Sequence, residues 1–329
     1  MPSGRLLLAI DGGQTATKAL LAAPDGRVLG AGLGGPSDHF HADGGESRNR
    51  EAIHGAILSA LQAAGATTSD VAVIALGLTG APTGGTQNPI VEKIVREIVC
   101  PDHMIVVADY VTNLAGASMG QPGVVVIAGG GAIAYGVTAG GQEAISGGFG
   151  YLLGDEGSAF DIGRRAITAA ARAEDGRGPR TALSPAVRSA LDLTAMRDVT
   201  RLVYRAGFRR DRISLLAPLV ADAARTGDEV ATSIMTAAGQ ELATAALAVV
   251  RTLYQPGKRV SVYLTGGVFE AGDVIRAPFV AALRDRWSEA LAREPAFPPS
   301  VGGLILAARA ANIDPDGAWL SALAGSLPR

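Results

Sequence analysis

Residues 6–18 read LLLAIDGGQTATK, and this segment is the most informative about the fold. It begins with an apolar run of strand length and turns through a glycine pair into a second apolar run at residues 18–23. The pair Asp25-Gly26 then predicts a hairpin turn, with a third strand at residues 27–31. The chain is therefore expected to open with three antiparallel strands.

The residues that follow predict the rest of one domain. Apolar residues recur at helical spacing from 53 to 64, and Gly65 stands where a left-handed cap ends a helix. Further strands are predicted at residues 71–78 and 104–108, separated by a helix that begins after Asn88-Pro89. This order of strands and helices predicts a mixed sheet flanked by helices.

The second half of the chain repeats this order. The predicted elements are strands at 124–128, 133–137 and 143–146, a mostly helical segment at 158–254, a strand at 260–264 and a helix at 277–291. Duplication is the economical interpretation, with an N-terminal domain over residues 1–118 and a larger C-terminal domain over 119–329. A ligand cleft is expected between them, and a return of the last helix to the N-terminal domain is left open.

Composition narrows the classes of function. The 329 residues carry a formal net charge of −2, and no long run of like charges suggests nucleic acid or an anionic membrane as a partner. Cys100 is the only cysteine, which excludes an internal disulfide, a multi-thiolate zinc site and an iron–sulfur cluster held within one chain. The four histidines lack the spacing of a metal site. With no secretory leader and no apolar stretch of about 18 residues, a cytoplasmic protein is expected.

The first glycine turn has the chemistry of a phosphate site. At Gly12 and Gly13, after Asp11, the missing β-carbons let backbone N–H groups approach phosphate oxygens, and Thr15 and Thr17 add hydroxyl donors. The string matches neither the Walker nor the dinucleotide-binding pattern, and a structural hairpin turn is the alternative. Residues 129–131 repeat the arrangement in the second half, so the two turns together favour a phosphate clamp.

Asp109 follows the predicted strand at residues 104–108, at the sheet edge where ligands gather in open α/β proteins. A carboxylate there can accept the proton of an attacking hydroxyl. The alternative is that Asp109 caps a helix that begins near Thr112. The sequence alone leaves both interpretations open.

The glycine-dense stretch at residues 147–158 predicts a binding loop. It combines two adjacent carboxylates, Asp155 and Glu156, with two aromatic residues, a set that suits the hydroxyls and the apolar face of a sugar. The alternative is that Asp155 or Ser158 caps the helix that begins there. A further glycine turn at residues 265–267 either seats an adenosine or connects strand to helix.

Taken together, these motifs resemble one known family. The chain is similar to the N-acetylglucosamine kinase-like branch (BadF/BadG/BcrA/BcrD ATPases) of the actin-like ATPase superfamily. The resemblance covers nearly the whole chain and is most specific in the loop at residues 147–158. It implies an α/β protein of two ribonuclease-H-like domains, each with a mixed five-stranded sheet flanked by helices, with the cleft between them.

The resemblance also implies a role for each motif. Asp109 is the expected base, Asp11 is the expected partner of Mg²⁺ through water, and ATP and Mg²⁺ are the expected cofactors. The expected nucleotide contacts are Asp11, Gly12, Gly13, Gln14, Thr15, Thr17, Lys18, Gly129, Gly130, Gly131, Thr265, Gly266 and Gly267. The expected sugar contacts are Ser37, Asp38, His39, Asp109, Gly148, Phe149, Asp155 and Glu156.

Two stretches depart from the family pattern. Residues 129–132 read Gly-Gly-Gly-Ala where the family usually has Gly-Thr-Gly-Ser, which removes two hydroxyls but keeps the backbone amides. Asp38-His39-Phe40 stands in place of an Asn-His-Trp-like stretch. An ionised Asp38 only accepts hydrogen bonds, which predicts a shift from N-acetylglucosamine toward a sugar with a free ammonium, such as glucosamine, or simple binding of ring hydroxyls.

The expected function is an ATP-dependent kinase of an amino sugar, N-acetylglucosamine or glucosamine, with O6 as the acceptor that the resemblance implies. One alternative is a sugar- or ATP-binding sensor that has lost catalysis. Another is an activator ATPase of a radical enzyme, which needs paired cysteine ligands that Cys100 does not supply. A small-molecule sugar is the expected partner, nucleic acid and membrane are not, and a homodimer stays open.

Overall fold

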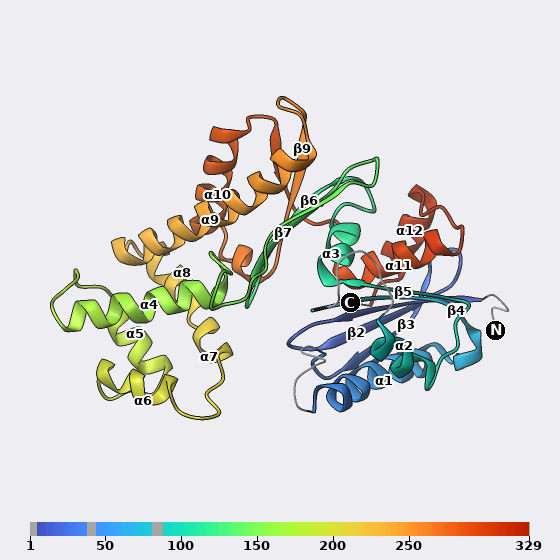
Figure 1. The fold of residues 1–329 in the computed structure, drawn as a ribbon, viewed down its shortest axis with the longest axis horizontal. Coiled ribbons are helices and arrows are strands. Elements are labelled where there is room, and N and C mark those ends of the chain that lie inside the picture. Colours follow the sequence, from blue (N-terminus) through green and yellow to red (C-terminus); the bar gives the residue numbers. More distant parts are fainter. Residues whose placement is uncertain (1–4, 38–43, 81–87, 329) are drawn as a thin grey trace. The chain divides into compact units, whose positions relative to one another are not determined.

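The computed structural model describes residues 5–37, 44–80 and 88–328. It contains two compact units, the first made of residues 1–121 with 295–329 and the second of residues 122–294 (Figure 1). The expected boundary between residues 118 and 119 differs from this division, and the return of the chain's end to the N-terminal domain, left open for the last helix, includes all of residues 295–329. Residues 295–329 belong to the first unit because their helices cover one face of its sheet.

Each unit is built on a mixed five-stranded sheet, which confirms the predicted fold class. In the first unit the strand order is β3-β2-β1-β4-β5. The strands are β1 (Leu6–Gly12), β2 (Thr17–Ala22), β3 (Val28–Gly34), β4 (Val71–Leu78) and β5 (His103–Ala108). The opening meander is antiparallel, β4 is parallel to β1, and β5 is parallel to β4. Every residue of β4 is buried, as expected for a strand covered on both faces.

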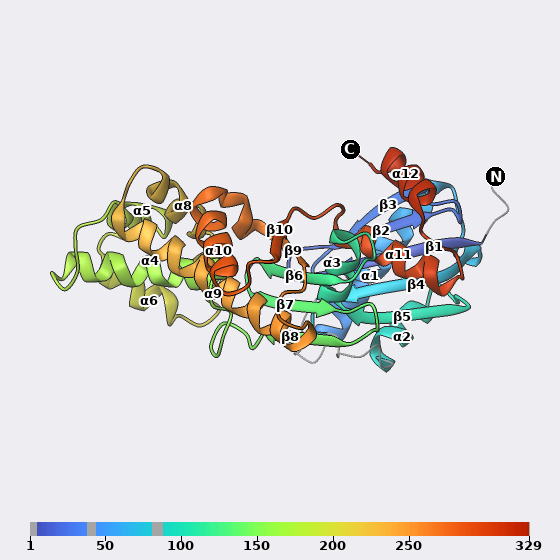
Figure 2. The same ribbon diagram turned by 90° about the horizontal axis from the view of Figure 1, so that it is seen from above.

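Helices pack on both faces of the first sheet. The helices are α1 (Gly45–Ala64), η1 (Thr68–Asp70), α2 (Pro89–Arg96), α3 (Asp109–Ala117), α11 (Pro299–Ala310) and α12 (Gly317–Ser326). One apolar core joins the sheet to α1 and α2, and another joins it to α11 and α12. Figure 2 shows α11 over β1 and β4, which it contacts. α1 approaches β3 closely, since a β-carbon at Gly32 would lie 2.0 Å from the carbonyl oxygen of Ala56.

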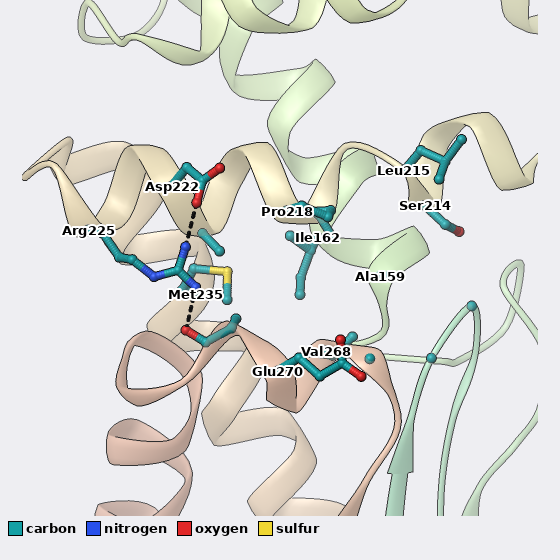
Figure 3. Close-up of a pocket in the computed structure, with 16 residues that line it drawn as sticks. Ala159, Ile162, Ser214, Leu215, Pro218, Asp222, Arg225, Met235, Val268 and Glu270 are labelled. Carbon is teal, nitrogen blue, oxygen red and sulfur yellow. Dashed lines mark hydrogen bonds and ion pairs between the residues drawn. The ribbon is translucent and has the colours of Figure 1, made fainter. Parts of the chain in front are cut away.

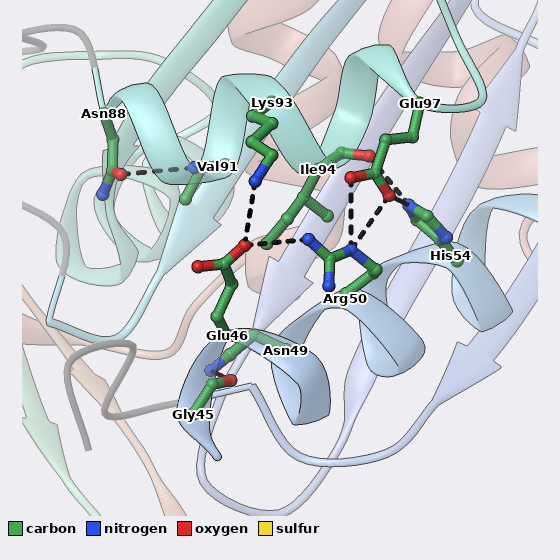
Figure 4. A network of polar contacts seen from close by, with 10 residues as sticks. All are labelled: Gly45, Glu46, Asn49, Arg50, His54, Asn88, Val91, Lys93, Ile94 and Glu97. Atoms are coloured by element: carbon green, nitrogen blue, oxygen red, sulfur yellow. Dashed lines mark hydrogen bonds and ion pairs between the residues drawn. The ribbon is translucent and has the colours of Figure 1, made fainter. Parts of the chain in front are cut away.

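A network of charged side chains joins α1 to α2 (Figure 4). Arg50 is at its centre, with Nε 2.9 Å from Glu97 Oε2 and Nη2 2.8 Å from Glu46 Oε1. Lys93 also pairs with Glu46, and His54 lies 3.5 Å from Glu97. Exposed ion pairs contribute little stability, so the buried apolar stripe of α2 supplies most of its attachment.

The second sheet repeats the topology of the first, with strand order β10-β9-β6-β7-β8. Its strands are β6 (Gly123–Ala128), β7 (Ala132–Val137), β8 (Glu143–Gly147), β9 (Val260–Thr265) and β10 (Ala290–Arg293). The first three form an antiparallel meander, β9 is parallel to β6, and β10 is parallel to β9. The duplication inferred from the sequence is thus present in the strand pairing.

The second unit is richer in helices than the first. They are α4 (Ala159–Glu174), α5 (Leu183–Ala190), η2 (Met196–Asp198), α6 (Val199–Val203), α7 (Asp211–Ser214), α8 (Ala217–Arg225), α9 (Glu229–Leu253), η3 (Gly267–Ala271) and α10 (Asp273–Arg286). By length and composition α9 would suffice to cross a membrane, but 56% of its most apolar window is buried inside the protein. It packs on α8 and α10, as a core helix does.

The predicted helix at residues 277–291 is wrong at its C-terminal end. α10 ends at Arg286, and residues 290–293 form β10, which pairs with β9. Trp287 is buried, and its Nε1 donates to the carbonyl oxygen of Lys258 at 2.9 Å. A few apolar residues at helical spacing also fit a short buried strand, and only the neighbouring strand decides between the two.

Candidate functional site

The first glycine turn connects β1 to β2 and is closed by a hydrogen bond from Gly13 N to the carbonyl oxygen of Ala16 at 3.1 Å. A β-carbon at Gly12 would lie 2.3 Å from Ser37 Oγ, whereas one at Gly13 would meet nothing closer than 3.9 Å. Gly12 is therefore required for packing, and Gly13 leaves room for a ligand. Among the nucleotide contacts predicted in this turn, three have exposed side chains: Gln14, Thr15 and Lys18.

Thr17 and Ser37 do not fit the ligand roles predicted for them. Both are fully buried, and Thr17 Oγ1 lies 2.8 Å from both Ser37 Oγ and the carbonyl oxygen of Gly35. The Ser37 amide in turn donates to the carbonyl oxygen of Gly13 at 3.0 Å. The two hydroxyls therefore stabilise the turn from inside. The predicted sugar contacts Asp38 and His39 lie outside the described residues.

Asp109 stands at the junction of β5 and α3. Thr79, the residue after β4, donates from Oγ1 to Asp109 Oδ2 at 2.7 Å. The N-cap of α3 is Ala108, so the carboxylate does not occupy the capping position. Burial raises the pKa of Asp109, and the Thr79 hydrogen bond opposes that rise. A half-buried carboxylate held by the Thr79 hydroxyl and by the backbone of Asp109 and Tyr110 is suited to accept a proton.

Asp11 lies near the end of β1, opposite Lys18 in the strand register. The pKa of Asp11 is raised to about 6, mainly by burial and further by the charge of Asp109, while Lys18 opposes the rise. Asp11 and Asp109 are therefore close enough to repel each other when both are ionised.

A divalent cation would relieve this repulsion, and carboxylate oxygens are ligands that Mg²⁺ prefers. Among the residues that the structure describes, no group of three or more His, Cys, Asp or Glu side chains is placed to hold a metal ion. The pair formed by Asp11 and Asp109 thus fits Mg²⁺ bound through few protein ligands and several waters.

The second glycine turn connects β6 to β7 and is closed by a hydrogen bond from Gly129 N to the carbonyl oxygen of Gly131 at 2.9 Å. Ala159 N, at the start of α4, donates to the carbonyl oxygen of Gly129 at 2.8 Å. A β-carbon at Gly129 would meet nothing within 4 Å. The turn therefore exposes backbone beside a helix N-terminus, an arrangement that favours an anion.

Asp155 supports this turn from the neighbouring loop. It is 8% exposed, with φ of 59°, and its Oδ1 accepts from Ala132 N at 3.3 Å. A β-carbon at Gly131 would lie 2.9 Å from Asp155 Oδ2. Burial raises the pKa of Asp155, while the Ala132 amide and Arg210 lower it. Asp155 is a predicted sugar contact, and its bond to the second glycine turn could not be predicted, because no local pattern of residues links the loop to the turn.

Glycines shape the rest of the loop at residues 147–158. Gly148 has φ of 74°, and its amide donates to the carbonyl oxygen of Ala132 at 3.0 Å. Phe149 is 74% exposed, and Glu156 is also exposed, so both predicted sugar contacts are accessible. Ser158, rather than Asp155, caps α4 by accepting a hydrogen bond from Asp161 N at 3.2 Å.

The third glycine turn follows β9. Gly266 has φ of 97°, and a β-carbon there would lie 2.3 Å from the carbonyl oxygen of Ala128, so this close approach requires glycine. A β-carbon at Gly267 would meet nothing within 4 Å. Thr265 is a predicted nucleotide contact, but its hydroxyl faces the sheet. Thr265 Oγ1 lies 3.4 Å from the carbonyl oxygen of Val126.

A cavity of about 480 Å³ lies where the second and third turns meet (Figure 3). The two turns contribute Gly129, Gly130 and Gly267 to the lining. The larger apolar side chains of the wall are Ile162, Leu215, Pro218, Met235 and Val268. The polar side chains are Ser214, Asp222, Arg225 and Glu270. This size and mostly apolar lining suit a nucleotide-sized ligand. The residues from α7 and α8 were not predicted, since an alanine-rich helical segment signals only a core.

Comparison with known proteins adds a family and close relatives. A model of the BadF/BadG/BcrA/BcrD ATPase family matches residues 8–307. The N-acetylmuramic acid/N-acetylglucosamine kinase of Clostridium acetobutylicum is 33% identical over 264 residues, which cover 80% of this chain and 85% of that protein. The N-acetyl-D-glucosamine kinase of Dictyostelium discoideum is 27% identical over 316 residues, which cover 93% of this chain and 98% of that protein.

Solved structures are similar over the same length. A candidate N-acetylglucosamine kinase from Chromobacterium violaceum matches with a TM-score of 0.74 and 30% identity, covering 93% of this chain and 99% of that one. The ROK family glucokinase of Streptomyces griseus, solved with glucose and AMPPNP, matches with a TM-score of 0.56 and 18% identity, covering 92% and 98%. At that lower identity the match shows a shared fold.

Proposed function

The chain belongs to the BadF/BadG/BcrA/BcrD ATPase family, and we propose that it is an ATP-dependent kinase of an amino sugar. The observation that carries the proposal is the half-buried Asp109 carboxylate, which accepts a hydrogen bond from Thr79 and lies near Asp11. It stands at the carboxyl ends of the parallel strands β1, β4 and β5, where α/β proteins bind reacting ligands.

In this proposal the cavity of the second unit takes ATP. The adenosine lies against the apolar wall, and the phosphates meet the backbone of the second glycine turn at Gly130, beside the N-terminus of α4. The missing hydroxyls at residues 130 and 132 leave this backbone contact intact. Mg²⁺ supplies charge neutralisation of the phosphates when bound, with Asp11 as its partner through water.

Asp109 accepts the proton of the sugar hydroxyl while the hydroxyl oxygen attacks the γ-phosphorus. A bond forms between that oxygen and phosphorus, and the bond from phosphorus to the oxygen of the departing ADP breaks. The Thr79 hydroxyl holds the carboxylate in one orientation throughout. The same hydrogen bond favours the ionised form of Asp109, which is the form that can act as a base.

The proposed substrate is N-acetylglucosamine or a closely related amino sugar, phosphorylated at O6. Support comes from the names of the two relatives, which both act on N-acetylated amino sugars. Gly148, Phe149 and Glu156 are the proposed sugar contacts of the second unit, of which Phe149 and Glu156 have exposed side chains. A cytoplasmic location fits an enzyme that consumes ATP.

The test is Mg²⁺-dependent ADP release across hexoses, hexosamines, N-acetylhexosamines and N-acetylmuramic acid. We expect turnover with one or more of the amino sugars and little with plain hexoses, and product analysis places the phosphate on the sugar. Binding of ATP and sugar without ADP release would support the sensor alternative and end the kinase proposal.

We further propose that Asp38 sets the preference between a free and an N-acetylated amino group on the sugar. An ionised Asp38 would favour a sugar with a free ammonium over its N-acetylated form, by about tenfold for a charge-assisted contact. Kinetics with glucosamine and N-acetylglucosamine, for the wild type and Asp38→Asn, decide this point. The idea fails when Asp38→Asn leaves the preference between the two sugars unchanged.

A further inference from the structure

Arg225 bridges two walls of the cavity in the second unit. It is the last residue of α8, and its Nη1 pairs with Asp222 one turn earlier on that helix. Its Nη2 donates to the carbonyl oxygen of Ala271, at the end of η3, at 2.8 Å. Figure 3 shows Arg225 at one end of the cavity and Leu215 and Ser214 at the other.

The two hydrogen bonds lie at the edge of the guanidinium, so a ligand in the cavity would approach Arg225 through a flat face of the group. Both Nη atoms are engaged at the edge of the group, which fixes the plane of the guanidinium. Arginine in such a setting stacks on aromatic rings through dispersion and cation–π attraction. The neighbouring lining is mainly apolar, including Met235 and Ile162, so the complementary ligand at this end is a flat aromatic ring.

We propose that Arg225 seats the purine base of the nucleotide. Its guanidinium stacks on the base, while Asp222 on the same helix orients the group and the hydrogen bond to Ala271 ties α8 to η3. This inference rests on the proposed use of ATP for the identity of the base. It adds a base-binding residue from a segment that carries no nucleotide-binding motif.

The two possible roles of Arg225, joining α8 to η3 or contacting the base, predict different effects of its removal. If Arg225 only joined α8 to η3, its removal would weaken all ligands of the cavity together or lower stability alone. If Arg225 contacts the base, its removal weakens a ligand that has a base and spares one that has only phosphates. ADP and inorganic tripolyphosphate are the two probes.

The experiment is calorimetric titration of both probes into the wild type, Arg225→Ala, Arg225→Lys and Arg177→Ala. Arg177 is the matched control, because it forms an exposed pair with Asp175 in the same unit and lies outside the cavity lining. We expect Arg225→Ala to weaken ADP binding about tenfold and to change tripolyphosphate binding less than twofold. Arg225→Lys should fall between, since lysine lacks the flat fork, and Arg177→Ala should match the wild type.

ADP binding within twofold of the wild type in Arg225→Ala, or an equal loss for both probes, overturns the inference. Should Arg225→Ala not fold, Arg225→Lys supplies the same comparison, with a selective loss of ADP affinity expected. The outcome is separable from the kinase proposal. Selective loss of ADP binding by a protein that phosphorylates no sugar would sink the kinase and leave the base-binding role standing.

Discussion

Thr79 Oγ1 donates to Asp109 Oδ2 at 2.7 Å, and the same hydroxyl lies 3.3 Å from the carbonyl oxygen of Gly12. The Thr79 amide also donates to that carbonyl oxygen, at 3.0 Å. Thr79, which directly follows β4, thus joins the proposed base Asp109 to the first glycine turn. The pKa of Asp109 depends on this contact, because the Thr79 hydrogen bond opposes the rise that burial causes.

Replacing Thr79 by valine should move the pH profile of the reaction. Without the hydroxyl donor the pKa of Asp109 rises further, so a smaller fraction of the base is ionised at a given pH. We expect the acid limb of kcat/KM against pH to move to higher pH in Thr79→Val and to return toward the wild type in Thr79→Ser. An acid limb that stays in place in Thr79→Val would remove this hydrogen bond from the mechanism.

Asp109→Asn should lower kcat by about 10² or more, because the amide cannot accept the proton of the acceptor hydroxyl. The side chain keeps its size, so the fold and ADP binding should persist. Steady-state turnover, thermal unfolding and ADP titration check the three points on the same sample. Near-normal turnover in a folded Asp109→Asn would mean that another group is the base.

Asp11→Asn should change how stability depends on pH. The pKa of Asp11 is about 6 in the folded protein against an ordinary 3.8, and each unit corresponds to about 1.4 kcal/mol, so ionisation of Asp11 costs roughly 3 kcal/mol. A raised folded-state pKa gives stability that is present below the unfolded pKa and is lost as the pH rises through about 6. The stability advantage of Asp11→Asn over the wild type should therefore grow as the pH rises from about 4 to about 6 and level off above that.

Urea unfolding with a chelator present, at several pH values in this window, measures that gain. Asp192→Asn is the matched control, because Asp192 has a side chain that is 92% exposed and a left-handed backbone that asparagine tolerates. The control should show no such trend. A difference between Asp11→Asn and the wild type that is constant across the window would contradict the expected shift.

Two alanine substitutions in the second glycine turn should have different effects: Gly131→Ala should lower stability, and Gly129→Ala should weaken nucleotide binding. In Gly131→Ala the new β-carbon would lie 2.9 Å from Asp155 Oδ2, and displacing that buried carboxylate should cost about 1 to 3 kcal/mol. In Gly129→Ala the β-carbon would meet no protein atom within 4 Å and would fill the space proposed for phosphate. We expect Gly129→Ala to keep the wild-type stability and to raise the KM for ATP. The reverse pattern would place the phosphates elsewhere.

Elements with local signals could be predicted from the order of residues alone. The glycine turns and the Asp25-Gly26 hairpin gave the opening meander, and Gly65 marked the end of α1. The repeated order of strands gave the second sheet up to β9. These features were predictable because turn chemistry and apolar periodicity act within a few residues.

Tertiary structure alone decided which side chains are free to meet a ligand. Thr17 is buried against Ser37, Asp155 reaches the second glycine turn, and Arg225 crosses from α8 to η3. It also made residues 290–293 a strand and returned residues 295–329 to the first unit. The physical reason is that burial and pairing depend on partners distant in the chain, and no local pattern of residues identifies those partners.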